Sequence, residues 1–259
     1  MIPGDLVAPL AALKARRPDA PLDVRWHATL PSTMDTASSL VHDGAAHGVV
    51  VVADAQTAGR GRRGSSWASP PGAGLYFSFV ARPPGVDATG LSLLTLAAGV
   101  AVRDGISSAT GLAPDLKWPN DLIVGRRKLA GILAEGIAIG TAGQSVIVGV
   151  GLNLQPAAYP PDVSIRATSI EGELGRPVER GQVFAEILIS LWDRLAQLAQ
   201  SPGDILQAWR RGSPNAIGTQ VEWDGRQGVT AGIDDTGALL VNTAGRTERI
   251  IAGELRWML

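Results

Sequence analysis

Residues 49–53 read Val-Val-Val-Val-Ala, an apolar run without a single polar position. A strand with one face in water alternates apolar and polar residues, whereas an unbroken apolar run is typical of a strand covered on both faces. The sequence therefore predicts a strand here that is buried on both sides of its sheet. Any fold assigned to this chain has to place other elements above and below this strand.

The remaining hydrophobic patterns divide most of the chain into alternating helices and strands. Ser32 and Asp35 have the spacing of a helix capping box, so a helix is expected to begin directly after Ser32. The predicted helices span residues 33–42, 91–110, 180–200 and 203–210, and the predicted strands span residues 24–28, 49–53, 75–81, 116–118, 122–124, 128–135 and 145–154. The first 22 residues have too little apolar periodicity for an independent domain.

The C-terminal part of the chain has a different texture. Four short strands are predicted at 220–223, 228–233, 238–242 and 248–251, separated by turn residues such as Asp224-Gly225 and Ala244-Gly245. Short strands with tight turns in so few residues are typical of a small barrel. We expect one domain over residues 1–212 and a second over residues 213–259, with the boundary in the Gly212–Asn215 turn region.

Composition excludes several classes of protein and site. The chain has 259 residues, a formal net charge of −1, no cysteine and only three histidines. Disulfides, thiolate catalysis and cysteine-ligated metals are thus excluded, and a histidine-rich metal site is not expected. No global positive charge favours nucleic acid or an anionic membrane. The N-terminus lacks the features of a signal peptide, and the apolar stretch 91–102 is too short to span a bilayer, so a cytoplasmic protein is expected.

Lysine is rare in this chain, because only Lys14, Lys117 and Lys128 stand among 23 basic residues. Two of the three lie within twelve residues of each other. Lysine carries a compact point charge and arginine a planar fork, so the two differ where space around an anion is limited. The retained pair points to a site that needs lysine, although chance remains an alternative.

A glycine- and arginine-rich loop follows the buried strand. Residues 56–67 read Gln-Thr-Ala-Gly-Arg-Gly-Arg-Arg-Gly-Ser-Ser-Trp. Glycines allow a close approach of the backbone to a ligand, and guanidinium groups add charge-assisted hydrogen bonds to phosphate or carboxylate. The pattern is neither a Walker A loop nor a Rossmann fingerprint. A solvated basic turn or an RGG-like nucleic-acid segment is the alternative.

Two further segments carry candidate charged residues. In Lys117-Trp-Pro-Asn-Asp121, proline stiffens a turn that presents lysine, asparagine and aspartate, although a simple Asx turn would look the same. In the strand beginning at Arg126, alternation predicts Lys128, Ala130 and Ile132 on one face and Gly131 on the other. A lysine on an otherwise apolar face needs an anion, unless it reaches solvent at the strand end.

Five segments occur in the order in which biotin protein ligases carry them. They are Ser32-Thr-Met-Asp35, the loop from Gln56 to Gly64 with Trp67, Lys117-Trp-Pro-Asn-Asp121, Arg127-Lys-Leu-Ala-Gly-Ile-Leu133 and Gly149-Val-Gly-Leu-Asn153. Residues 232–239 also resemble the C-terminal domain of that family. The resemblance implies an α+β fold, with a mixed-sheet catalytic domain of the biotin/lipoate ligase type followed by a small SH3-like β-barrel. The DNA-binding domain of the bifunctional members has no counterpart in the resemblance, so we expect a protein of the ligase-only type.

The resemblance also implies roles for individual residues, while the metal ligands stay unassigned. Catalytic roles fall on Arg62, Lys117 and Lys128. Biotin-binding roles fall on Ser32, Thr33, Met34, Gln56, Gly59, Arg60, Gly61, Arg62, Lys128, Gly131 and Gly149. ATP- or adenylate-binding roles fall on Arg60, Arg62, Trp67, Lys117, Asn120, Lys128 and Asn153. In one departure from the family, the residue after Gly64 is Ser65, where a basic residue is common.

The implied reaction is the activation of biotin by ATP as biotinyl-5′-AMP, followed by transfer to one lysine of a biotin carboxyl carrier protein or domain. Mg²⁺ is expected with ATP, and a cation between the two reacting anions lowers their repulsion. The chain lacks Met-Lys-Met, the acceptor signature of a carrier, so the acceptor lysine belongs to another protein. We expect a monomer or weak homodimer without nucleic-acid or membrane partners. A lipoate or octanoate ligase and a nucleic-acid-binding module are the alternatives.

Overall fold

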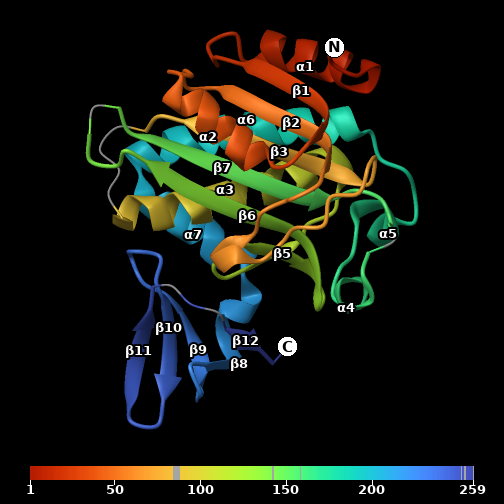
Figure 1. Ribbon diagram of the computed structural model, residues 1–259. Coiled ribbons are helices and arrows are strands. Elements are labelled where there is room, and N and C mark those ends of the chain that lie inside the picture. The colour runs from red at the N-terminus through yellow and green to blue at the C-terminus, as the bar shows by residue number, and fades with distance from the viewer. Residues whose placement is uncertain (84–87, 142, 158, 252, 254, 259) are drawn as a thin grey trace.

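The fold was taken from a computed structural model that describes residues 1–83, 88–141, 143–157, 159–251, 253 and 255–258. A large sheet with helices on both faces forms most of the protein, and a smaller sheet lies at the C-terminal end (Figure 1). The helices are α1 (Gly4–Arg16), α2 (Thr33–His42), α3 (Ala88–Thr110), α4 (Pro161–Ser164), α5 (Ile170–Leu174), α6 (Arg180–Gln200) and α7 (Pro202–Gly212), with short 3₁₀ turns η1 (Arg62–Gly64) and η2 (Pro214–Ala216).

The large sheet has seven strands in the order β1-β2-β3-β7-β6-β5-β4. These are β1 (Asp23–Leu30), β2 (Val49–Gln56), β3 (Gly74–Ala81), β4 (Asp115–Lys117), β5 (Asp121–Val124), β6 (Arg127–Ile137) and β7 (Ser145–Asn153). Strands β1 and β2 are parallel and joined through α2, whereas the other neighbours are antiparallel. The sheet is therefore mixed, as the resemblance implied.

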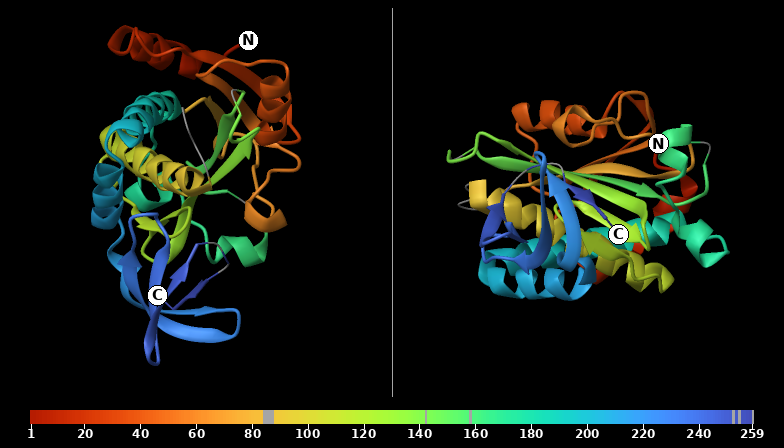
Figure 2. Two further views of the ribbon diagram at one scale, coloured as in Figure 1. Left: turned by 90° about the vertical axis from the view of Figure 1, so that its left-hand side faces the viewer. Right: turned by 90° about the horizontal axis from the view of Figure 1, so that it is seen from below.

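Strand β2 shows why the apolar run of residues 49–53 is informative. Val50 and Val52 pack into the main core beneath α3 and α6, whereas Val49 and Val51 pack into a second core beneath α2. All four side chains are buried. Figure 2 shows α3 and α6 on one side of the sheet and α2 on the other. The prediction of a strand buried on both faces is confirmed.

Helix α3 is the longest helix and lies in the core. Within the described part of the chain, its segment Gly90–Thr110 is the one helical stretch long and apolar enough to cross a membrane. Most of that stretch is buried inside the protein, where it packs against α6, α7 and the sheet. Its apolar character is thus explained by its place in the core.

The C-terminal residues form a second, antiparallel sheet in the order β11-β10-β9-β8-β12. Its strands are β8 (Ile217–Trp223), β9 (Arg226–Ile233), β10 (Leu239–Thr243), β11 (Arg246–Ile250) and β12 (Arg256–Trp257). This sheet is consistent with the expected small barrel. The indole nitrogen of Trp118 donates a hydrogen bond of 2.9 Å to the Gly237 carbonyl, and Val221, Leu239 and Val241 join the main core. The second sheet, which with η2 we call the C-terminal unit, is therefore packed against the large sheet and its helices, which we call the catalytic unit.

Four elements have no counterpart among the predicted ones. Helix α1, which packs against α6, the short helices α4 and α5, and strand β12 were all missed. Helix α1 is held to α6 by ion pairs from Arg16 to Glu186 and from Arg180 to Asp5. These elements are short or weakly periodic, and their contacts with the rest of the protein stabilise them.

Candidate active site

One large cleft of about 1210 Å³ opens between the sheet, the loop after β2 and the C-terminal unit. It is lined by nearly all the predicted site residues, namely Ser32, Thr33, Met34, Gln56, Arg60, Gly61, Arg62, Trp67, Lys117, Asn120, Lys128, Gly131 and Gly149. Segments far apart in sequence thus converge on one site, although the role of each residue stays a prediction. We call residues 57–73 the active-site loop.

Two predicted site residues do not line the cleft. Asn153 is buried at the end of β7, and its side-chain nitrogen donates to the Thr168 carbonyl at 2.9 Å. Gly59 lies at the base of the active-site loop, where a Cβ would come within 2.4 Å of the Trp67 carbonyl oxygen. In this structure Asn153 fixes the segment after β7 and Gly59 lets two parts of the loop approach. Their roles toward biotin and the adenylate stay predictions.

The inner end of the cleft is lined by short polar side chains. The Gln56 side-chain oxygen accepts hydrogen bonds from the Thr33 backbone N–H at 2.8 Å and from its hydroxyl at 3.2 Å. The Gln56 side-chain nitrogen donates to the Ser69 hydroxyl at 2.8 Å, and Ser78 donates to the Thr33 hydroxyl at 2.9 Å. The Ser32 hydroxyl is buried without a hydrogen-bond partner among the described residues. It is therefore free to bond a polar ligand.

The predicted capping box at the start of α2 is wrong in its side-chain chemistry. The helix begins at Thr33 as expected, but Ser32 makes no side-chain capping hydrogen bond. Gln56 from β2 accepts the Thr33 N–H instead, so the cap comes from a neighbouring strand. Asp35 is also not a capping partner, because its carboxylate accepts a hydrogen bond from Arg60.

The middle of the cleft is a trench formed by two glycines that face each other across β6 and β7. Gly131 pairs with Gly151, and the indole of Trp67 lies against both. A Cβ would be 2.9 Å from the Trp67 ring at Gly131 and 2.3 Å from it at Gly151. At Gly149, a Cβ would be 2.5 Å from the Met34 sulfur. Gly131 and Gly151 are required because the flat Trp67 indole lies directly on the sheet, and Gly149 because the Met34 side chain does.

The predicted facing of Lys128 on β6 is wrong. Lys128 lies on the same side as Gly131, whereas Ala130 and Ile132 pack into the main core on the other side. The cause is an irregularity in the pairing with β5, where Leu122 pairs with Ala130 but the next residue, Ile123, pairs with Lys128. Leu129 is thus an extra residue in the ladder, and the alternation of faces shifts at that point.

Lys128 has the anionic partner that its position demands. Its ammonium nitrogen lies 2.6 Å from Oδ1 of Asp121 and 5.3 Å from the centre of the Trp67 ring. Asp121 belongs to a predicted motif but had no predicted role. The pairing of Lys117 with Asp121 across β4 and β5 brings this carboxylate to the cleft. The one signal in the sequence for a role of Asp121 was its position directly after Asn120, a predicted site residue.

The outer end of the cleft is cationic. Arg62 donates to the Asn120 side-chain oxygen at 3.2 Å, and Asn120 in turn donates to the Ile132 carbonyl at 2.7 Å. The Lys117 ammonium lies 5.8 Å from the centre of the Trp257 ring. Burial lowers the pKa of Lys117 and that of Arg62, with the Asp121 carboxylate opposing both shifts. These cations are partly stripped of water, which strengthens their attraction for an anion.

Several cleft residues were missed from the sequence. The C-terminal unit contributes Glu222, Trp223, Asp224, Gly225, Leu255, Arg256 and Trp257, and Arg166 comes from the segment after β7. Arg63 and Arg126, which also line the cleft, belong to predicted segments but had no predicted role of their own. No signal in the sequence pointed to the C-terminal residues, since the two units meet only in the folded protein. The cleft is thus built by both units.

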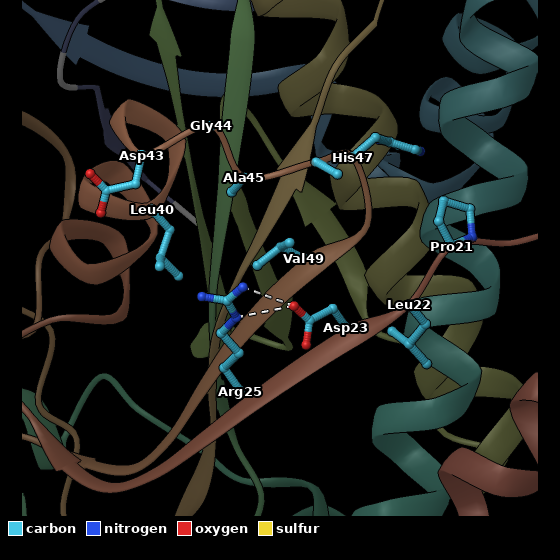
Figure 3. A pocket seen from close by; sticks show the side chains of 11 residues that line it. Pro21, Leu22, Asp23, Arg25, Leu40, Asp43, Gly44, Ala45, His47 and Val49 are labelled. Atoms are coloured by element: carbon cyan, nitrogen blue, oxygen red, sulfur yellow. Dashed lines mark hydrogen bonds and ion pairs between the residues drawn. The ribbon is translucent and has the colours of Figure 1, made fainter.

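A second, smaller cavity of about 430 Å³ lies beside the start of β1. Figure 3 shows Arg25 and Asp23 in this cavity, turned toward each other. The two side chains form an ion pair of 3.0 Å, in which each charge is balanced by the other. None of the predicted site residues lines this smaller cavity, so the large cleft is the candidate active site.

Comparison with known proteins agrees with this geometry. Residues 26–153 match the Biotin/lipoate A/B protein ligase family. The chain is 34% identical over 236 residues to the bifunctional ligase/repressor BirA of Bacillus subtilis (strain 168), across 89% of this chain and 72% of that protein. It is 36% identical over 216 residues to the biotin–[acetyl-CoA-carboxylase] ligase of Mycobacterium tuberculosis, across 80% of this chain and 78% of that protein.

The fold comparison points the same way. The structure of a biotin protein ligase from Aquifex aeolicus in complex with biotin and ATP matches with a TM-score of 0.78 and 27% identity, covering 91% of this chain and 98% of that chain. The family match, the sequence relatives and the shared fold lead to one assignment. The chain belongs to the biotin/lipoate A/B protein ligase family, and within it to the biotin protein ligases.

Proposed function

We propose that this protein activates biotin with ATP as biotinyl-5′-AMP and transfers the biotinyl group to a lysine of a biotin carboxyl carrier protein. The observation that carries this proposal is the polarity of the cleft. Its inner end offers neutral hydrogen-bonding groups around Ser32, Thr33 and Gln56, and its outer end offers the cations Arg62, Lys117 and Lys128. A ligand with a neutral polar head and a carboxylate at the other end fits this arrangement.

The inner end suits the ureido ring of biotin. This ring offers one carbonyl acceptor and two N–H donors, and the unpartnered Ser32 hydroxyl can serve either. The apolar part of biotin then lies along the trench between Met34 and Trp67, which place sulfur and ring surfaces over the glycines. The carboxylate is thereby directed toward Lys128.

The first step joins two anions. The biotin carboxylate attacks the α-phosphorus of ATP, an acyl–phosphate bond forms, and pyrophosphate leaves. Lys128 and Arg62 lie where they lower the repulsion between carboxylate and phosphate, and their preorganised charges stabilise the transition state. Before the substrates bind, the Asp121 carboxylate holds the Lys128 ammonium at the trench.

The expected Mg²⁺ fits the oxygen donors at the outer end. Among the described residues no cluster of three or more His, Asp or Glu side chains forms a dedicated metal site. Mg²⁺ is commonly held by one or two carboxylates together with substrate phosphates, and the Asp121 carboxylate and the Asn120 amide line the cleft at this end. When bound, Mg²⁺ would neutralise charge on the departing pyrophosphate.

In the second step the amine of the carrier lysine attacks the acyl carbon of the adenylate. An amide bond forms and AMP leaves, so no side chain of this protein has to form a covalent bond. Until the carrier binds, the adenylate must be kept from water. The active-site loop is in place to do this, since Trp67 and Arg62 both extend from it into the cleft.

We include in the proposal that the chain acts as a ligase without a DNA-binding activity. Residues 4–16 form α1, which packs on α6 as part of the catalytic unit. This ligase-only reading is tested by a gel-shift measurement with DNA.

Incubation of the purified protein with ATP, Mg²⁺, a carrier domain and either biotin, lipoate or octanoate tests the proposal. We expect biotin-dependent pyrophosphate exchange and a mass increase on the carrier lysine with biotin alone. Labelling with lipoate or octanoate but not with biotin would replace the proposal by the alternative ligase activity. The absence of any exchange with all three acids would refute activation by ATP.

A further inference from the structure

Arg60 of the active-site loop is bound to two carboxylates from different elements. Its guanidinium donates to Asp35 in the first turn of α2 at 2.9 Å and to Glu135 on β6 at 2.5 Å. The resemblance placed Arg60 at biotin or the adenylate, but both of these hydrogen bonds go to the protein. The guanidinium therefore links the loop to two fixed parts of the fold.

The backbone around Arg60 transmits this link to Trp67. Arg60 and Ser66 form an antiparallel bridge, the Gly61 N–H donates to the Ser65 carbonyl at 2.7 Å, and the Trp67 N–H donates to the Gly59 carbonyl at 2.8 Å. The loop is thus a small hairpin with Arg60 on one arm and Trp67 on the other. Fixing Arg60 fixes the position of the Trp67 indole over the trench.

The register of β6 explains why Glu135 is available to Arg60. Gly131 and Leu133 line the cleft, and Glu135 lies on the same face one alternation further along the strand. Asp35 reaches the same place from α2, which covers this face of the sheet. The two carboxylates hold the guanidinium from two sides, at the edge of the cleft.

We propose that Asp35 and Glu135 are positioning residues that hold the active-site loop closed over the cleft through Arg60. The inference rests on the proposed function where it concerns the adenylate, since a closed loop retains that intermediate. The carboxylates themselves touch no reacting atom. They act by setting how often the loop opens.

The expected size of the effect follows from exposure. The Arg60, Asp35 and Glu135 side chains are 38%, 56% and 35% exposed, so each ion pair is screened by water. A single exposed pair changes an equilibrium by about 1.5- to 5-fold. Loss of both pairs should therefore raise the open fraction of the loop by about 2- to 30-fold.

Proteolysis of the ligand-free protein measures loop opening directly. Trypsin cleaves after Arg62 and Arg63, which lie in the loop, and mass spectrometry identifies these cuts. Asp35→Asn and Glu135→Gln lie far from the cleaved bonds in sequence, so they leave the intrinsic susceptibility of those bonds unchanged. We expect faster cleavage in each single variant and about 2- to 30-fold faster cleavage in the double variant. High salt should bring the wild-type rate toward that of the double variant.

The matched control is Asp23→Asn, which removes the exposed ion pair with Arg25 in the smaller cavity. It should leave loop cleavage at the wild-type rate. A double variant that unfolds at the wild-type temperature and is cleaved at the wild-type rate would overturn the proposal. Equal acceleration by Asp23→Asn would also overturn it, because the effect would then be one of general surface charge.

Adenylate release gives the second readout. With biotin and ATP, the double variant should label bystander proteins several-fold more than the wild type, while its rate of pyrophosphate exchange at saturating substrates stays similar. If the proposed function is wrong, neither protein labels bystanders, yet the difference in proteolysis remains. If the positioning role is wrong, labelling is equal and proteolysis is equal.

Discussion

Replacement of Lys128 by arginine tests the chemistry of the cleft without changing its charge. The Lys128 ammonium is confined between Asp121, 2.6 Å away, and the Trp67 ring, 5.3 Å away. It also lies 3.3 Å from the point that a Cβ on Gly131 would occupy. A compact ammonium can meet Asp121 and still face a ligand in the trench. A planar guanidinium is larger and presents its donors in one fixed plane.

We expect Lys128→Arg to lose about 100-fold in the rate of the first step. An arginine at this place can pair with Asp121 through two parallel hydrogen bonds, which turns its donors away from the trench. The carboxylate and the α-phosphate then meet without a cation between them, and loss of one such preorganised donor costs about 10²–10³ in kcat. Because the charge is kept, the fold and its melting temperature should change little.

The assay is biotin-dependent exchange of pyrophosphate into ATP at saturating substrates. Lys14→Arg is the control, since Lys14 is an exposed residue of α1 remote from the cleft. It should retain wild-type exchange. Exchange by Lys128→Arg within about twofold of the wild type would refute the argument, because charge alone would then suffice at this position.

Three further predictions concern the trench, the outer cations and the second unit. Gly151→Ala places a Cβ 2.3 Å from the Trp67 ring and should weaken biotin binding about tenfold or more, as measured by calorimetry. Burial lowers the pKa of Lys117, so this residue loses its charge at a lower pH than an ordinary lysine, whose pKa is about 10.4. Pyrophosphate exchange should therefore decline as the pH rises through that lowered pKa, and Lys117→Arg should extend exchange to higher pH. We propose residues 213–259 as a separate domain, and their deletion uncovers Trp118 and the neighbouring apolar face. The truncated protein should therefore aggregate. A soluble product with normal adenylate formation and transfer would contradict this expectation.

Much of the fold could be predicted because the relevant signals are local. The bounds of α2 and α6 were predicted to the residue, and the seven strands of the large sheet were each located, since hydrophobic periodicity reports which face of an element is buried. The apolar run at Val49 also determined that its strand is covered on both sides. The small sheet was predicted from turn residues spaced between short strands.

The candidate site could be predicted in its membership but not in its contacts. The ordered segments brought nearly all the predicted residues to one cleft. The bulge at Leu129 reversed the expected facing of Lys128, because register depends on how β5 and β6 pair and not on β6 alone. The identity of Asp121 as the partner of Lys128 depends on the same pairing.

Sequence by itself determined most of the helices and strands, including every strand of the large sheet, and which motifs carry charge. Tertiary structure decided that Gln56 caps α2 in place of Ser32, that Arg60 is held by Asp35 and Glu135, and that the C-terminal unit supplies one wall of the cleft. The physical reason is range. Burial patterns repeat within a few residues, whereas each of these contacts joins side chains that are more than twenty residues apart and meet only when the layers pack.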